Sequence, residues 1–186
     1  YTTASAEERN KWQEYHKWMF DARYYLPLDS KKKLVLEAKA HFGFIGAYNK
    51  GKTGIGPFER FVLGGAGLAG GFNSFVLGKE IIGLRGYEDN QITPPNYTAG
   101  NSSNQQGGGV VYEKLGLELR YPVTTGNAAT IYGLIFTEAG NNWGNYEDFN
   151  PFKMYKSAGV GARIFMPAFG LIGLNWAYGF DPVPLG

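Results

Sequence analysis

The chain of 186 residues carries 18 basic and 16 acidic side chains, which are interspersed along the sequence and give a formal net charge of +2. Nucleic-acid binding is therefore unsupported, because it requires a concentrated basic surface. The absence of cysteine excludes a disulfide scaffold, a thiolate metal site and a cysteine nucleophile. Glycine accounts for 28 residues and aromatic side chains for 16% of the chain, a composition that favours twisted strands over helices.

The apolar residues are not gathered into a membrane helix, which would require about 20 consecutive apolar positions. Transmembrane β-barrels lack such runs as well, because lipid-facing and lumen-facing residues alternate along each strand. The mean hydropathy of -0.27 therefore does not distinguish a soluble sheet from a membrane sheet.

Alternation with a period of two predicts the first two strands, at residues 12–26 and 34–44. The apolar face of the first strand carries Trp12, Trp18, Phe20, Ala22, Tyr24 and Leu26, and its polar face carries Gln13, Lys17, Asp21 and Arg23. The second strand alternates Leu34, Leu36, Ala38, Ala40, Phe42 and Phe44 with Lys33, Glu37, Lys39 and His41. Neighbouring strands with one apolar and one charged face indicate a sheet between lipid and water, or between a core and solvent.

Residues 48–109 interrupt this alternation and predict one long loop, which is expected to be ordered at residues 58–90 and mobile in the Asn, Ser, Gln and Gly tract at residues 96–109. A connection of this length is usually functional or disordered. Its centre, Gly83-Leu84-Arg85-Gly86-Tyr87, places an arginine between two glycines. Glycine permits a sharp turn and close approach, and a guanidinium offers five donors in a fixed geometry, so the segment is expected to present Arg85 to a carboxylate.

Four further strands are predicted after the loop. In the first of them Leu115, Leu117, Leu119 and Tyr121 oppose Lys114, Glu118 and Arg120, and Pro122 is expected to end the strand. Residues 129–140 form the next strand, residues 141–156 a polar loop, and residues 157–166 and 172–180 the last two strands. The total of six strands, each of about 10–15 residues, suits tilted membrane strands.

The facing of Glu138 is ambiguous, because it falls in line with the bulky side chains of Tyr132, Leu134 and Phe136. A β-bulge would account for a carboxylate on that side of the strand. The alternation by itself assigns Glu138 to neither face of the sheet.

Six strands are too few to close a membrane barrel, since bacterial barrels begin at about eight strands. The chain is therefore either a soluble sheet, such as a secreted or periplasmic β-sandwich, or part of a larger barrel. The turn-like residues 181–186 follow the last predicted strand without a further strand, which favours the second interpretation.

Four places in the sequence resemble the BamA family, whose members assemble β-barrel proteins in bacterial outer membranes. They are Phe61-Val62-Leu63-Gly64-Gly65, Gly83-Leu84-Arg85-Gly86-Tyr87, Leu117-Glu118-Leu119, and Ser157-Ala158-Gly159-Val160-Gly161 with Gly170-Leu171-Ile172. The family's loop motif has the form Val-Arg-Gly-Phe or a close variant, from which Leu84 and Tyr87 depart conservatively.

The resemblance implies an all-β fold, namely an antiparallel transmembrane β-barrel segment of about six strands, incomplete as a barrel, with the long extracellular loop of residues 48–109 folded into the lumen. In the family, the loop arginine contacts acidic residues on the strands that follow. Carried over to this sequence, the loop-anchoring carboxylates would be Glu118 and Glu138. A guanidinium in a narrow, partly dry lumen requires such partners, because a buried charge without one is costly.

The resemblance covers nearly the whole chain but only part of the family's barrel, so we expect residues 1–186 to be the C-terminal portion of the barrel of a longer subunit. It implies a non-enzymatic insertase of the bacterial outer membrane, without a cofactor, that templates incoming barrel proteins on strand edges. The expected partners are unfolded client proteins, accessory assembly lipoproteins, the rest of the barrel with its periplasmic POTRA domains, and lipid. The alternatives are the pore of a two-partner secretion transporter and a porin-like structural barrel.

Other patterns carry less weight. The segment Gly65-Ala66-Gly67-Leu68-Ala69-Gly70 matches a dinucleotide fingerprint, but no helix is expected to follow it, so a closely packed loop is the better interpretation. His16 and His41 lack a second ligand at metal-binding spacing. We expect a solvated lumen wall of mixed charges at Asp21, Arg23, Glu37 and Lys39, and interface markers at Trp12, Trp18, Trp143 and Trp176.

Overall fold

The structure is a computed structural model that describes residues 15–47, 59–66, 80–94, 108–126, 129–168 and 170–183. The start of the first predicted strand, most of the polar tract at residues 96–109 and residues 67–70 of the dinucleotide-like motif lie outside the described residues. None of the described residues belongs to a helix that is long and apolar enough to cross a membrane.

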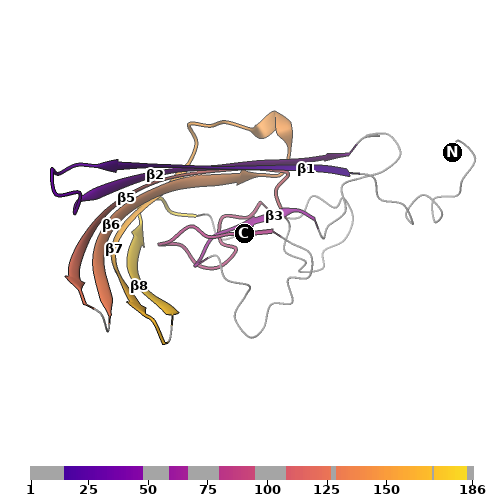
Figure 1. Cartoon of the computed structure of the whole chain (residues 1–186). Coiled ribbons are helices and arrows are strands. Elements are labelled where there is room, and N and C mark those ends of the chain that lie inside the picture. Colours follow the sequence, from indigo (N-terminus) through magenta and orange to yellow (C-terminus); the bar gives the residue numbers. More distant parts are fainter. Residues whose placement is uncertain are drawn as a thin grey trace, which may run out of the picture.

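Six antiparallel strands form one curved sheet in the order β1-β2-β5-β6-β7-β8 (Figure 1). Their bounds are β1 (Tyr15–Pro27), β2 (Val35–Ala47), β5 (Val111–Thr125), β6 (Thr130–Trp143), β7 (Tyr155–Met166) and β8 (Gly170–Gly179). The sheet does not close, because β1 and β8 each have a single neighbour among the described strands. The predicted all-β class, the six antiparallel strands and the incomplete barrel are confirmed.

The sheet exposes an apolar face and buries charged side chains on the other, which is the reverse of the pattern in a soluble protein. Large apolar side chains on the convex face are exposed, among them Trp18, Phe20, Leu117, Ile135 and Trp176. Three carboxylates on the concave face are buried: as whole residues, Glu37, Glu118 and Glu138 are 0%, 2% and 4% exposed. A soluble β-sandwich buries its apolar face, so that alternative does not fit the described residues.

Three predicted boundaries are wrong. Pro122 does not end a strand, because β5 continues past it, with a register shift between Pro122 and Thr124 in the pairing with β6. Irregular pairing at this place accommodates a residue that cannot donate to the ladder. The polar loop predicted at residues 141–156 is shorter at both ends, since β6 extends to Trp143 and β7 begins at Tyr155.

Part of the long loop packs inside the curve of the sheet. Its two short strands, β3 (Phe61–Leu63) and β4 (Glu80–Ile82), pair in parallel on the concave side (Figure 1). An apolar core joins the loop to one end of the large sheet and consists of Ile45, Phe61, Leu63, Ile82, Leu84, Ile92, Val110, Val111, Tyr112 and Trp143. This packing brings the segment that follows β4 onto the charged face of the sheet.

Candidate functional site

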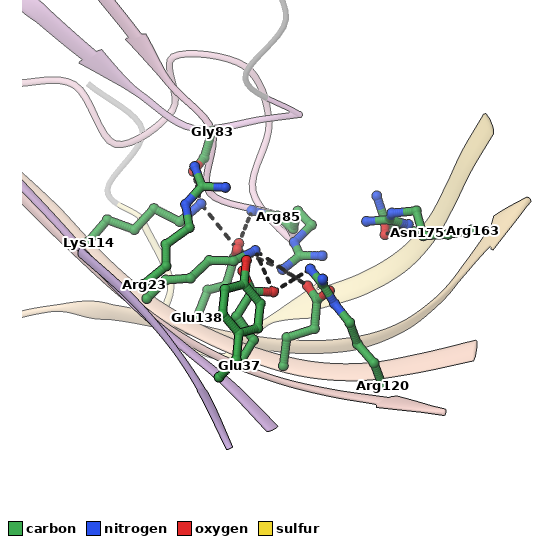
Figure 2. A network of polar contacts seen from close by, with 12 residues as sticks. Arg23, Glu37, Gly83, Arg85, Lys114, Arg120, Glu138, Arg163 and Asn175 are labelled. Atoms are coloured by element: carbon green, nitrogen blue, oxygen red, sulfur yellow. Dashed lines mark hydrogen bonds and ion pairs between the residues drawn. The ribbon is translucent and has the colours of Figure 1, made fainter. Parts of the chain in front are cut away.

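The segment Gly83-Leu84-Arg85-Gly86-Tyr87 follows β4 and carries Arg85 to carboxylates on two strands (Figure 2). Arg85 Nη2 lies 2.8 Å from Glu138 Oε1 on β6 and 3.1 Å from Glu118 Oε2 on β5. The three side chains are largely buried, at 15% exposure for Arg85, 4% for Glu138 and 3% for Glu118. The structure thus brings together the arginine and both carboxylates that were singled out in the sequence.

Glu138 holds the loop through its main chain as well as through the guanidinium. The Arg85 main-chain N–H donates to Glu138 Oε2 at 2.9 Å, and Lys114 Nζ lies 3.1 Å from Glu138 Oε1. Lys114 also donates to the carbonyl of Gly83 at 2.5 Å. Charge-assisted hydrogen bonds of this kind are stronger than neutral ones, so they fix the loop backbone irrespective of the rotamer of Arg85.

The facing of Glu138 follows from a regular strand. It shares the inner face of β6 with Leu134 and Phe136, while Ile135 between them is 61% exposed on the other face. The bulge suggested for this carboxylate is wrong, because β6 pairs with β7 without a register shift. Inward Phe136 has a partner in the site, since the guanidinium carbon of Arg85 lies 3.4 Å from its ring centroid, within the range of a cation–π contact.

Glu118 stands directly opposite a second buried carboxylate, Glu37 on β2. Like charges at paired positions repel, so their burial requires compensating cations. Arg120 contacts both, with Nε 2.7 Å from Glu118 and Nη2 against Glu37, and Lys39 Nζ lies 3.3 Å from Glu37 and 3.9 Å from Glu118. The hydroxyl of Tyr25 donates to Glu37 at 2.9 Å.

The position of Glu37 in this network was missed at the level of the sequence, where it was grouped with Asp21, Arg23 and Lys39 in a solvated wall. Asp21 and Arg23 do form an exposed ion pair at 2.9 Å, whereas Glu37 is fully buried. The alternation placed Glu37 on the charged face. It did not reveal which carboxylates of that face would be paired across strands and covered.

Gly86 requires the conformational freedom of glycine. Its φ of 96° is a conformation that other residues rarely adopt, and a Cβ atom there would lie 2.9 Å from Ser157 Cβ and 2.9 Å from the main-chain carbonyl carbon of Tyr178. A Cβ on Gly179 would in turn lie 2.8 Å from the carbonyl oxygen of Gly86. The loop backbone therefore packs directly on β7 and β8.

Tyr87 ties the loop to the ends of these strands. Its hydroxyl donates to the carbonyl of Lys156 at 2.7 Å and accepts from the main-chain N–H of Asp181 at 3.3 Å. Burial raises the pKa of the Tyr87 phenol, which favours the donating form. Arg85 thus joins the loop to β5 and β6, and Gly86 and Tyr87 join it to β7 and β8. We call these three residues the loop latch.

The latch borders a cavity of about 390 Å³ on the concave face. Six cationic side chains line the cavity, namely Arg23, Lys39, Arg85, Lys114, Arg120 and Arg163, together with the carboxylates Asp21, Glu118 and Glu138. Arg163 differs from Arg85 in its partners, because it donates to the carbonyls of Ala162 and Leu174 and to Asn175 Oδ1, which are all neutral. It therefore offers a matched comparison for Arg85.

The candidates for a metal site and for a dinucleotide motif have structural roles. His41 lies in the cavity lining with its Nε2 atom 2.9 Å from the hydroxyl of Tyr112. In the part of the chain that the structure describes, no three histidine or acidic side chains gather closely enough to hold a metal ion. Gly65, which opens the dinucleotide-like motif, has a φ of 67° and forms a bridge with Leu84, so it serves the packing of the loop.

Comparisons with known proteins agree with this geometry. A family model described as the Omp85 superfamily domain matches residues 5–183. The crystal structure of BamA from Haemophilus ducreyi lacking POTRA domains 1-3 is similar to this chain, with a TM-score of 0.65 at 19% sequence identity. The match covers 91% of this chain and 32% of that chain, so this chain spans about a third of that protein's solved length. No curated protein sequence matches.

Proposed function

The chain belongs to the Omp85 superfamily, and from this premise we propose that it is the C-terminal portion of the barrel of an outer-membrane subunit that folds and inserts other barrel proteins. In this proposal residues 1–186 form part of one barrel domain, and residues 48–109 are its lumenal loop. The shared fold with a BamA barrel over most of the chain supports the assignment.

The observation that carries the proposal is that one loop on the concave face joins four consecutive strands, β5 to β8. Arg85 holds β5 and β6 through Glu118 and Glu138, and Gly86 packs on Gly179 at the end of β8. In this proposal the loop latch stiffens the C-terminal half of the barrel, and clients pair with a strand edge of the complete barrel.

An exposed strand edge supplies the chemistry that this function requires. Main-chain N–H and C=O groups along an edge pair with an incoming strand whatever its side chains are, so one edge serves many clients. Strand pairing and the burial of apolar side chains in lipid are favourable by themselves, and no nucleotide, metal or other cofactor is needed. The proposed partners are unfolded outer-membrane clients, accessory lipoproteins, periplasmic POTRA domains, the rest of the barrel, and lipid.

Depletion of the parent subunit in its native cell tests this function. The abundance of all outer-membrane proteins is measured by quantitative proteomics after depletion, with secreted proteins measured in the medium. We expect many unrelated barrel proteins to fall together. Loss of one exported protein alone would identify a two-partner secretion pore instead, and an unchanged proteome would leave only a porin-like structural role.

A further inference from the structure

The loop between β6 and β7, residues 144–154, lies on the convex side of the sheet, away from the latch (Figure 1). It contains a single short helical turn, η1 (Tyr146–Asp148). The ring of Phe149 packs edge-on against Trp143, with 4.9 Å between centroids, and against Phe42 at 6.0 Å. Both partners occupy outward positions of their strands, so the loop covers the apolar face at one end of the sheet and leaves Trp143 only 6% exposed.

A tight turn in this loop presents one aromatic side chain to the surroundings. Asn150 Oδ1 accepts from the main-chain N–H of Phe152 at 3.0 Å, and the Asn150 carbonyl accepts from the N–H of Lys153 at 3.1 Å. Asn141 Nδ2 donates to the carbonyl of Lys153 at 2.6 Å and so ties the turn to β6. Phe152 is nevertheless 90% exposed. The turn therefore leaves the ring of Phe152 available to an apolar partner outside the described residues.

The level of the loop along the strands indicates what that is. The exposed apolar side chains on the outward face of β5 are Leu115, Leu117 and Tyr121. Glu113, opposite Phe42, is the next outward residue towards the loop, and Val111 follows it. Val111 pairs with Trp143 and lies in one cross-strand row with Phe44 and Trp18. The loop begins at this row, at the end of the sheet beyond the exposed apolar positions of β5.

We propose that residues 144–154 form a lipid-interface anchor in which Phe152 inserts beside the headgroups of the membrane leaflet next to the aromatic row. The occupant is lipid because the loop continues the apolar outer face through the contact of Phe149 with Phe42. Exposed charged residues of both signs, Glu147, Asp148 and Lys153, belong to the same loop, as is typical of an interfacial segment. The proposal rests on the membrane placement in the proposed function.

Depth-dependent fluorescence quenching tests the anchor in the complete parent subunit, reconstituted in lipid vesicles. Single cysteines are introduced by Phe152→Cys, by Ile135→Cys at an outward position of β6, and by Lys31→Cys in the exposed turn between β1 and β2. Each variant carries one environment-sensitive dye, and the vesicles contain lipids with a spin label near the headgroup or near the chain end. Resistance to SDS at low temperature verifies that every variant is folded.

We expect the dye at Phe152 to be quenched more by the shallow spin label than by the deep one, with blue-shifted emission, and the dye at Lys31 to be quenched by neither. Quenching at Ile135 without quenching at Phe152 would overturn the anchor while the membrane placement stands; that pattern would fit a protein partner. Absence of quenching at both positions would overturn the membrane placement and the anchor together.

Discussion

Replacement of Arg85 by alanine removes the part of the loop latch that reaches β5 and β6. The guanidinium loses its ion pairs with Glu138 at 2.8 Å and Glu118 at 3.1 Å. It also loses the cation–π contact with Phe136 at 3.4 Å. The hydrogen bond from the main-chain N–H of residue 85 to Glu138 survives, because it does not depend on the side chain. We therefore expect the loop to loosen without being released from the sheet.

The expected cost follows from what the carboxylates retain. Breaking a buried ion pair costs about 3–5 kcal/mol when the remaining charge has no other partner. Here Glu138 keeps Lys114 at 3.1 Å and Glu118 keeps Arg120 at 2.7 Å, so neither carboxylate is stranded. Adding a cation–π contribution of about 1 kcal/mol to a reduced ion-pair contribution, we expect Arg85→Ala to lower the free energy of unfolding by about 2–4 kcal/mol.

The assay is the temperature dependence of the folded fraction of the parent barrel in SDS, read from its electrophoretic mobility, together with urea unfolding in detergent. A loss of about 1 kcal/mol lowers the Tm of a domain of about 250 residues by about 2 °C and that of a larger barrel by less, so the variant should unfold a few degrees lower. Arg163→Ala is the matched control, because it removes the same charge from the same cavity but breaks hydrogen bonds to neutral acceptors only. Equal destabilisation by the two variants would refute a specific latch, since it would trace the effect to lumenal charge in general.

Three further predictions concern the same loop. Gly86→Ala should destabilise the barrel by about 2–4 kcal/mol in urea unfolding because of its positive φ and close packing. Gly116→Ala is the control, since its Cβ would have nothing nearer than 3.8 Å, and it should change stability by less than about 0.5 kcal/mol. Similar losses of stability in the two variants would contradict close packing of the loop on the strands. Tyr87→Phe keeps the ring and removes two hydrogen bonds, so the free energy of unfolding should fall by about 1–2 kcal/mol and the loop should be proteolysed faster. An unchanged rate of proteolysis would show that the hydroxyl does not hold the loop. Exchange of the charges in the double variant Arg85→Glu, Glu118→Arg should not restore the thermal stability lost in Glu118→Arg, because the new carboxylate would face a second buried carboxylate; full rescue would show that a single pair holds the loop.

The strands could be predicted from the sequence because the two environments of the sheet impose a period of two. The first and last residues of the strands were harder to predict. Pro122 looked like a terminator, but pairing continues past it through a register shift with β6. Asn141 and Asn142 looked like loop residues, yet both are buried in β6: Asn142 Nδ2 donates to the carbonyl of Phe61, and Asn141 Nδ2 to that of Lys153. Side-chain amides that bond to distant main-chain groups cannot be told from loop amides in a single sequence.

Three residues of the site could be predicted, but the contacts between carboxylates and bases of neighbouring strands could not. The resemblance singled out Arg85, Glu118 and Glu138, whereas the opposition of Glu37 and Glu118 depends on the register of β2 with β5 across a long loop. Alternation specifies the face of a residue but not its level along the strand relative to another strand. The contact of Phe136 with Arg85 could not be predicted either, because it forms only when the loop lies against the inner face of β6.

Charge balance shows what Arg85 contributes. The buried carboxylates of the sheet already have cationic partners on the sheet itself, which are Lys39 and Arg120 for Glu37, the same two residues for Glu118, and Lys114 for Glu138. These three buried carboxylates face three bases of the sheet, so this network is neutral without the loop. Arg85 therefore does not serve mainly to neutralise the wall. Its value lies in belonging to the loop, because its side chain connects the loop to Glu118 on β5 and Glu138 on β6 and so strengthens the main-chain contacts of the same segment.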